Sequence, residues 1–131
     1  MANEAVLLVE TNEAINFTVS NTAAIEKGTV LKIIDPMSVS GGAAWNDVVV
    51  GIAAEEKIAM DGKTSIGVYD RGYFIMKASG SITAGDALRC SGNLVYSAVD
   101  INKFSIGVAM ETATNTETLV VRVNPISYTL S

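Results

Sequence analysis

The sequence predicts an all-β protein: a small barrel or sandwich built from two similar halves, with at most one short helix. Three observations support this class. Short runs rich in Val, Ile and Thr alternate with turn residues along the chain. The 11 Gly residues suit many tight turns. Two long stretches of the sequence resemble each other. With 131 residues, 49% hydrophobic and 18% charged, the chain has enough apolar material for a packed core.

About nine or ten strands are expected along the chain. The strand candidates are four to six residues long, and most have Gly, Asp, Asn or Ser at a boundary, which favour turns. They are residues 15–19, 29–34, 48–53, 65–69, 72–77, 87–90, 93–96, 104–109 and 118–123. Helix signals are weak. Residues 53–60 contain good helix formers, but an isolated helix of about two turns is marginal. We therefore allow one short helical turn there.

The internal repeat has an offset of about 54–57 residues. Residues 25–32 resemble residues 82–89, because each segment has Ile, two spacers, Gly, two spacers, Leu and a cation. Residues 50–53, Val-Gly-Ile-Ala, also resemble residues 106–109, Ile-Gly-Val-Ala. The Ile places an apolar anchor before a tight turn, in which Gly adopts a positive φ. Each half is too small to close a core alone, so we expect the two halves to pack together.

We expect one β-rich domain over residues 24–124, with repeat units at 24–77 and 81–124. Residues 1–23 precede it as an N-terminal arm or edge strand, and residues 125–131 follow it as a C-terminal tail. Within the first segment an apolar run, residues 5–9, is followed by polar residues from Glu10, and sequence alone leaves open a plain edge strand or an arm that pairs with another chain.

A loop of small residues, 37–47, holds the only tryptophan, Trp45. A loop tryptophan is either a contact anchor on the surface or a lid that folds back over the core. We keep Trp45 as a candidate contact residue in an exposed loop.

The residue types present argue against an enzyme. The chain has no histidine, which removes the commonest general base and the commonest metal ligand. Its single cysteine, Cys90, lies in an expected strand and offers neither a disulfide nor a zinc site. The carboxylates lie mostly at turns, where none forms an evident pair. We predict no catalytic residue, no metal and no cofactor.

Charge and hydropathy restrict the partners. The formal net charge of −5 disfavours nucleic acid and an anionic membrane, since both require basic surfaces. No apolar run approaches the roughly 18–20 residues that span a bilayer, and the N-terminus lacks the basic region of a signal peptide. We expect synthesis in a cytoplasm.

The order of these features resembles the family of small phage capsid decoration proteins, also called head-stabilising or head-fibre proteins. The resemblance covers about residues 24–124. It is carried by six segments rich in Gly, Ala and Val at turns: 24–31, 49–55, 72–80, 82–88, 106–109 and 119–123.

The resemblance implies a β-rich, barrel-like domain bound on the outside of an icosahedral head. Such proteins commonly form homotrimers at three-fold and quasi-three-fold positions, where they clamp neighbouring subunits of the major capsid protein and stabilise the expanded head. It therefore implies a virion protein on the outer capsid surface, made in the host cytoplasm. Family members often order an N-terminal arm on the capsid, which makes residues 2–13 candidates for that role. The implied capsid-contact residues are Val6, Leu7, Leu8, Val9 and Glu10.

The alternative function is a receptor- or carbohydrate-binding β module. The Ile-x-x-Gly-x-x-Leu unit also recurs in β-clip-type domains of sugar-processing enzymes. Glycan binding generally stacks sugars on exposed aromatic rings, so an exposed cluster of Trp45 with tyrosines would favour this alternative.

Overall fold

The computed structural model describes residues 4–11, 13–35, 38–42, 48–97 and 104–127. These residues form strands, turns and bends, with no helix among them. The prediction of an all-β protein with two similar halves is confirmed. In the described part of the chain, no helix is long and apolar enough to cross a membrane.

The strands follow one another at short intervals. In chain order they are β1 (Val6–Glu10), β2 (Ile15–Thr18), β3 (Val30–Asp35), β4 (Ser38–Ser40), β5 (Val49–Ala53), β6 (Ser65–Tyr69), β7 (Gly72–Ala78), β8 (Ala87–Ser91), β9 (Leu94–Ser97), β10 (Phe104–Ala109) and β11 (Thr118–Ser127). In β7, buried residues alternate with half-buried ones, which is the pattern that a strand with one face on a core requires.

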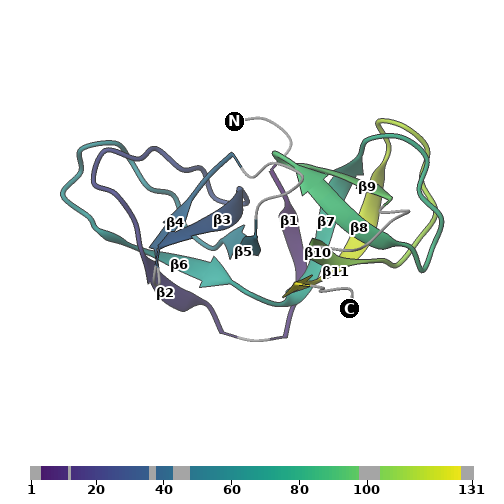
Figure 1. Cartoon of the computed structure of the whole chain (residues 1–131), viewed down its shortest axis with the longest axis horizontal. Helices are drawn as coiled ribbons and strands as arrows, with labels where there is room; N and C mark the ends of the chain where they lie inside the picture. The colour runs from purple at the N-terminus through teal and green to yellow at the C-terminus, as the bar shows by residue number, and fades with distance from the viewer. Residues whose placement is uncertain (1–3, 12, 36–37, 43–47, 98–103, 128–131) are drawn as a thin grey trace.

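The first half of the molecule is a closed barrel in the strand order β2-β4-β3-β5-β6. In this barrel β2 pairs with β4 in parallel and with β6 antiparallel. The pairs β3–β4, β3–β5 and β5–β6 are antiparallel. Figure 1 shows this half at the left, with the strands of the second half at the right.

The second half repeats this plan. Its sheet has the order β1-β7-β11-β10-β8-β9, and a further parallel pairing joins β7 to β9. The five strands β7 to β11 therefore follow the same cyclic order as β2 to β6, with the same parallel and antiparallel pairs. Strand β1 is an addition to this plan, on the edge of β7.

The correspondence extends to single hydrogen bonds. Ile25 and Lys57 exchange two backbone bonds of 2.8 and 2.7 Å, outside the strands of the first half. In the second half Ile82 and Ala113 exchange bonds of 2.8 and 2.9 Å. These bridges fix which residues correspond between the halves, namely Ile25 with Ile82 and Lys57 with Ala113.

The two glycines of the sequence repeat occupy the same turn conformation. Gly28 has a φ of 91° and donates to the carbonyl of Ala53 at 2.9 Å. Gly85 has a φ of 93° and donates to the carbonyl of Ala109 at 2.8 Å. Both φ values lie in the left-handed region, which glycine adopts without steric cost.

The pairing groups the strands differently from the repeat units expected at 24–77 and 81–124. Strand β7 pairs with β9 and β11 of the second half, and its counterpart in the first half is β2, which lies before residue 24. The sequence repeat is strongest at the Ile-x-x-Gly turns, so it did not reveal that a strand precedes each turn. Strand β11 also continues to Ser127, where it pairs with Phe104, so part of the expected C-terminal tail is strand.

Two local expectations were wrong. Residues 53–60 form no helical turn, because Ala53 ends β5 and Lys57 bridges to Ile25. Long-range pairing here overrides the helix propensity of the segment. The small-residue loop expected at 37–47 contains strand β4, whose Val39 is buried in the first barrel.

Two clusters of buried side chains form the core. The smaller cluster fills the first barrel around Leu31, Ile66 and Val68. The larger fills the second half and also includes Val30 and Ile52 of the first half. The larger cluster therefore joins the two halves into one body.

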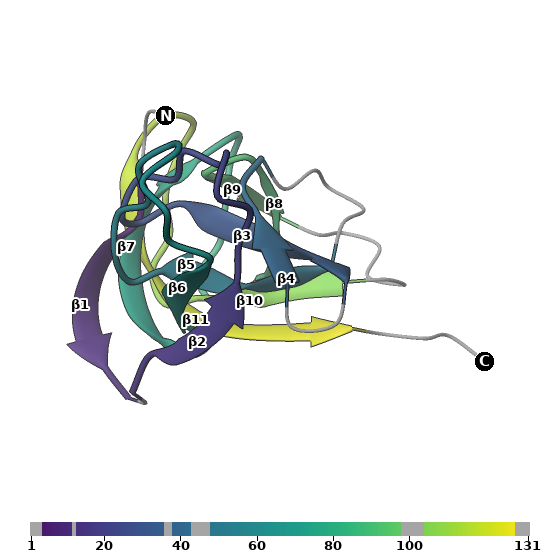
Figure 2. The ribbon, with the colours of Figure 1, turned by 90° about the vertical axis from the view of Figure 1, so that its left-hand side faces the viewer.

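Strand β1 is attached to both halves. It pairs with β7 of the second half, and the amide of the preceding residue, Ala5, donates to the carbonyl of Gly28 in the first half at 2.8 Å. Ala5 is buried within the larger core cluster. Figure 2, a view from the side of the first half, shows β1 at the edge of the molecule beside β7.

Candidate functional site

The described residues contain no group of three or more His, Cys, Asp or Glu side chains arranged to hold a metal ion. Cys90 is a buried free thiol within the larger core cluster. The candidate functional sites among the described residues are exposed surfaces and the hollows beside them.

The five contact residues expected from the sequence lie together in β1. Val6 pairs with Ile75 and Leu7 with Phe74, while Leu8 falls at a bulge before the next pair. Val6, Leu8 and Val9 are 58%, 52% and 49% exposed. Leu7 differs from them, because it is half-buried and packs against the larger core cluster. Leu7 thus anchors β1, and its neighbours present apolar side chains to solvent.

The free edge of β1 adds a second feature. Among the described strands β1 pairs with β7 alone, so no described strand covers its other edge. A strand edge offers backbone N–H and C=O groups on which another chain can add a strand. An apolar edge that no described strand covers is also an aggregation hazard that proteins usually avoid, which makes β1 a candidate interaction surface.

An apolar row continues from β1 across the sheet. Val6 pairs with Ile75, and Ile75 pairs with Val120 of β11. Laterally paired residues point to the same face of a sheet. The neighbouring row along these strands, Leu7–Phe74–Val121, faces the core. Because side chains alternate between the two faces of a sheet, the row Val6–Ile75–Val120 faces outward. Trp45, the other expected contact residue, lies outside the described residues.

A second exposed apolar site escaped the sequence reading. It lies where the loop between β2 and β3 meets the loop between β5 and β6, at the left end of Figure 1. We call it the first tip and define it as Ala24, Ile58, Ala59 and Met60, all exposed. Ile58 and Met60 are 62% and 69% exposed, the highest values for large apolar side chains among the described residues.

The second half provides an internal comparison. The residues that correspond to the first tip are Ser81, Thr114, Asn115 and Thr116, which we call the second tip; all are exposed and all are polar. The backbone is alike at both tips. Met60 has a φ of 63° and donates to the carbonyl of Asn21 at 2.7 Å, and Thr116 has a φ of 73° and donates to the carbonyl of Ala78 at 3.0 Å. The fold therefore does not require apolar residues at this place.

Lys57 holds the first tip in position. Lys57 is buried, with 2% of its surface exposed. Its ammonium donates hydrogen bonds to Asn21 O at 3.0 Å, Ile58 O at 2.7 Å and Asp61 Oδ1 at 2.7 Å. These bonds tie the two loops of the tip together. The hydrogen bond from Lys57, followed by the bond from the Lys63 backbone N–H, lowers the pKa of Asp61 below its ordinary value.

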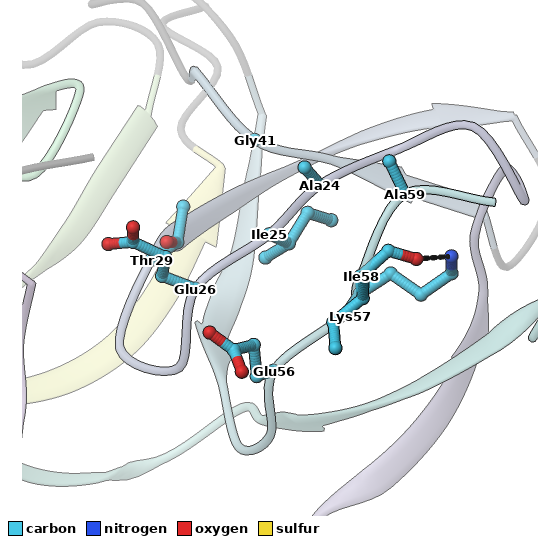
Figure 3. A pocket seen from close by; sticks show the side chains of 9 residues that line it. All are labelled: Ala24, Ile25, Glu26, Thr29, Gly41, Glu56, Lys57, Ile58 and Ala59. Atoms are coloured by element: carbon cyan, nitrogen blue, oxygen red, sulfur yellow. Dashed lines mark hydrogen bonds between the residues drawn. The ribbon is translucent and has the colours of Figure 1, made fainter. Parts of the chain in front are cut away.

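A hollow of about 410 Å³ lies beside the first tip. Three of the four tip residues line it, together with Ile25, Glu26, Thr29, Gly41, Glu56 and Lys57. Figure 3 shows the carboxyl groups of Glu26 and Glu56 at one side of the hollow, while the Lys57 side chain extends away from them. Because the Lys57 ammonium pairs with Asp61, the lining of this hollow is acidic and apolar.

A hollow of opposite charge lies on the second half. It has a volume of about 320 Å³. Its lining residues lie near the start of β7 and in the middle of β11, with one more after the end of β1: Thr11, Arg71, Gly72, Tyr73, Arg122, Val123 and Asn124. We call it the arginine hollow. Tyr73 and Arg122 are paired residues on the outward face of the sheet. This hollow also escaped the sequence reading, because its two arginines are about 50 residues apart and only strand pairing brings them together.

Comparison with known proteins agrees with the fold and with the resemblance drawn from the sequence. The family model for phage cement protein matches residues 9–125. Among solved structures, the N base of head fiber gp8.5 of bacteriophage phi29 matches with a TM-score of 0.58 and 16% sequence identity. That match covers 85% of this chain and 92% of the other, and it shows a common fold. No curated protein matches the sequence.

The family model spans most of the chain, including both halves and nearly all described strands. The expected role as a structural, head-stabilising protein on the outer capsid surface is confirmed at the level of the family. This chain belongs to the phage cement protein family.

Proposed function

We propose that this protein is a homotrimer that binds the major capsid protein through β1. The proposal rests on how β1 is held and exposed. Leu7 anchors β1 on the larger core cluster, while Val6, Leu8 and Val9 remain exposed beside a strand edge that no described strand covers. In this proposal the β1 edge receives a strand of the capsid subunit, and the apolar row Val6–Ile75–Val120 packs against the same subunit.

Anchoring supports this choice over a loosely attached arm. Ala5 is buried, its amide is bonded to Gly28, and Leu7 packs on the larger core cluster. Such anchoring presents the edge with little loss of conformational entropy on binding. A trimer would engage three such edges at once, and the combined affinity of several linked contacts exceeds that of one contact alone.

The remaining expectations belong to this proposal. We infer that the protein has no catalytic role and binds neither nucleic acid nor membrane. The absence of histidine from the sequence and its net charge of −5 support this inference.

Co-sedimentation with expanded, undecorated heads tests the proposal. The wild-type protein should bind saturably, at three copies per three-fold site. The double variant Val6→Thr/Leu8→Thr places threonine, which favours strands, at both positions but removes apolar contact. Since burial of one such side chain contributes roughly 1.5–3 kcal/mol, the variant should bind at least about tenfold more weakly.

Ile15→Thr is the matched control, because Ile15 is an apolar residue of β2 that is 42% exposed in the first half. It should bind heads as the wild type does. Deletion of residues 2–13 is a poorer test, because it also removes Ala5 and Leu7 from the core. Equal binding by wild type and the Val6/Leu8 variant would contradict a contact through β1.

A further inference from the structure

We propose that the first tip of one copy docks into the arginine hollow of a second copy, and that this head-to-tail contact builds the trimer. The inference rests on the homotrimer in the proposed function and names the two surfaces that form it. Contacts between different surfaces of identical chains close into a ring when the rotation per copy is suitable.

The first tip has the chemistry of a contact surface. Two large apolar side chains, Ile58 and Met60, are more than three-fifths exposed, at positions where the second half carries Thr114 and Thr116. The second tip shows that polar residues can occupy these positions when the tip faces solvent. Exposed apolar side chains on a rigid loop mark a binding surface.

Rigidity supports the same conclusion. Lys57 is buried at the position where the second half has Ala113, and it bonds to two carbonyl groups and to Asp61. Burying an ammonium is costly unless it is fully hydrogen-bonded. The second tip keeps the same backbone without such a group. The additional bonds of Lys57 thus fix the apolar tip in place before it binds.

Opposite charges favour a second copy of this chain as the partner of the first tip. The exposed Glu56 lines the hollow beside the first tip, and Arg71 and Arg122 line the arginine hollow. The ring of Tyr73 lines the arginine hollow and suits Met60, because a methionine sulfur contacts an aromatic ring favourably. A second copy of this chain therefore offers a complementary surface.

The two surfaces lie on different halves of one molecule. The loops of the first tip are at the outer end of the first half, whereas β7 and β11 belong to the second half (Figure 1). The arginine hollow is lined by residues of these two strands and of the segments next to them. A single copy therefore leaves one of each surface open, as a head-to-tail ring requires. Neither surface includes Val6, Leu8 or Ile75, so the trimer would keep those available for the capsid, whereas Val9 borders the arginine hollow because it pairs with Tyr73.

Light scattering on the purified protein without heads tests the contact. The wild type should have three times the mass of one chain. Ile58→Thr/Met60→Thr, which introduces the residues of the second tip, should reduce the mass to that of one chain. Arg71→Glu/Arg122→Glu should do the same from the other side. Circular dichroism should show the wild-type strand signal for both variants; should the charge reversal unfold the protein, Arg122→Gln replaces it.

Mixing the two variants provides the decisive measurement. Each variant retains one intact surface, so an equimolar mixture should form dimers with one tip in one hollow, at twice the mass of one chain. The Val6→Thr/Leu8→Thr variant is the matched control, and it should remain a trimer even if it no longer binds heads. Loss of head binding without loss of the trimer would thus separate the two proposals.

Three outcomes would overturn the head-to-tail contact. One is a wild-type mass equal to that of one chain. Another is a tip variant that remains a trimer. The third is a tip variant that dissociates while the hollow variant does not, which would mean that the tip contacts another surface.

Discussion

The side-chain oxygen of Asn93 in the second half accepts a hydrogen bond from the backbone N–H of Val30 in the first half, at 3.0 Å. Both residues are buried, at 4% and 0% exposure. Val30 also belongs to the larger core cluster, which otherwise consists mainly of side chains from the second half. This bond is therefore a specific polar link between two halves that share one apolar core.

Asn93→Ala should lower the free energy of unfolding by about 1–3 kcal/mol, because it leaves the buried N–H of Val30 without its acceptor. Urea denaturation measures this change, and hydrogen exchange of the Val30 amide should become faster. Asn115→Ala is the control, since Asn115 is an exposed residue whose Oδ1 accepts a bond from Gly80 within the second half. Equal losses for the two variants would argue against a special role for Asn93.

One glycine in each half marks the closest approach to a neighbouring backbone. A β-carbon on Gly51 would lie 2.1 Å from the carbonyl oxygen of Tyr69, and one on Gly107 would lie 2.1 Å from that of Arg122. Backbone atoms cannot rotate away, so Gly51→Ala and Gly107→Ala should each destabilise the protein by about 3 kcal/mol or more. Thermal unfolding measures this loss.

Gly67→Ala is the matched control, because a β-carbon there would meet Ala14 and Ala54 at ordinary distances of 3.6 and 3.7 Å. It should unfold near the wild-type temperature. If Gly51→Ala were as stable as Gly67→Ala, the close packing of β5 against β6 would not be needed for folding.

The Asp61 carboxylate should make stability depend on pH. Its pKa is lowered in the folded protein by the bonds from Lys57 and Lys63, whereas the unfolded chain has the ordinary value of about 3.9. The charged form is thus favoured by folding, so this stabilisation is present above about pH 4 and is lost as the pH falls through the folded pKa. Asp61→Asn should be less stable than wild type at pH 7, and the difference should shrink in acid.

Urea denaturation of both proteins from about pH 7 to pH 2 measures this linkage. A difference in free energy that stays constant over the whole range would contradict the assignment. It would mean that Asp61 acts through packing rather than through its charge.

Lys57→Met should lower stability by about 1–3 kcal/mol, because the carbonyl oxygens of Asn21 and Ile58 lose their shared donor. The double variant Lys57→Met/Asp61→Asn should recover part of this loss, since the carboxylate is no longer left without its cation. Chemical denaturation of the two single variants and the double variant gives the coupling energy. Strictly additive effects would show that the two side chains do not interact in solution.

The sequence by itself was sufficient to predict the all-β class and to identify the internal repeat. Alternating β-branched runs and glycine turns give nearly all the strands, because a half-buried strand needs apolar residues at every second position. The Ile-x-x-Gly spacing identifies corresponding turns in the two halves, since Gly28 and Gly85 both need a positive φ. The apolar run of β1 was also visible as a candidate interaction segment.

Only the tertiary structure decided how those strands are grouped and which surfaces they form. The pairing of β7 with β9 and β11, rather than with the first half, depends on contacts between residues distant in the sequence. The anchoring of β1 to both halves and the meeting of Arg71 with Arg122 in one hollow depend on the same kind of contact. Local propensity carries no information about such partners, because pairing is selected by how a whole set of strands buries its apolar faces together.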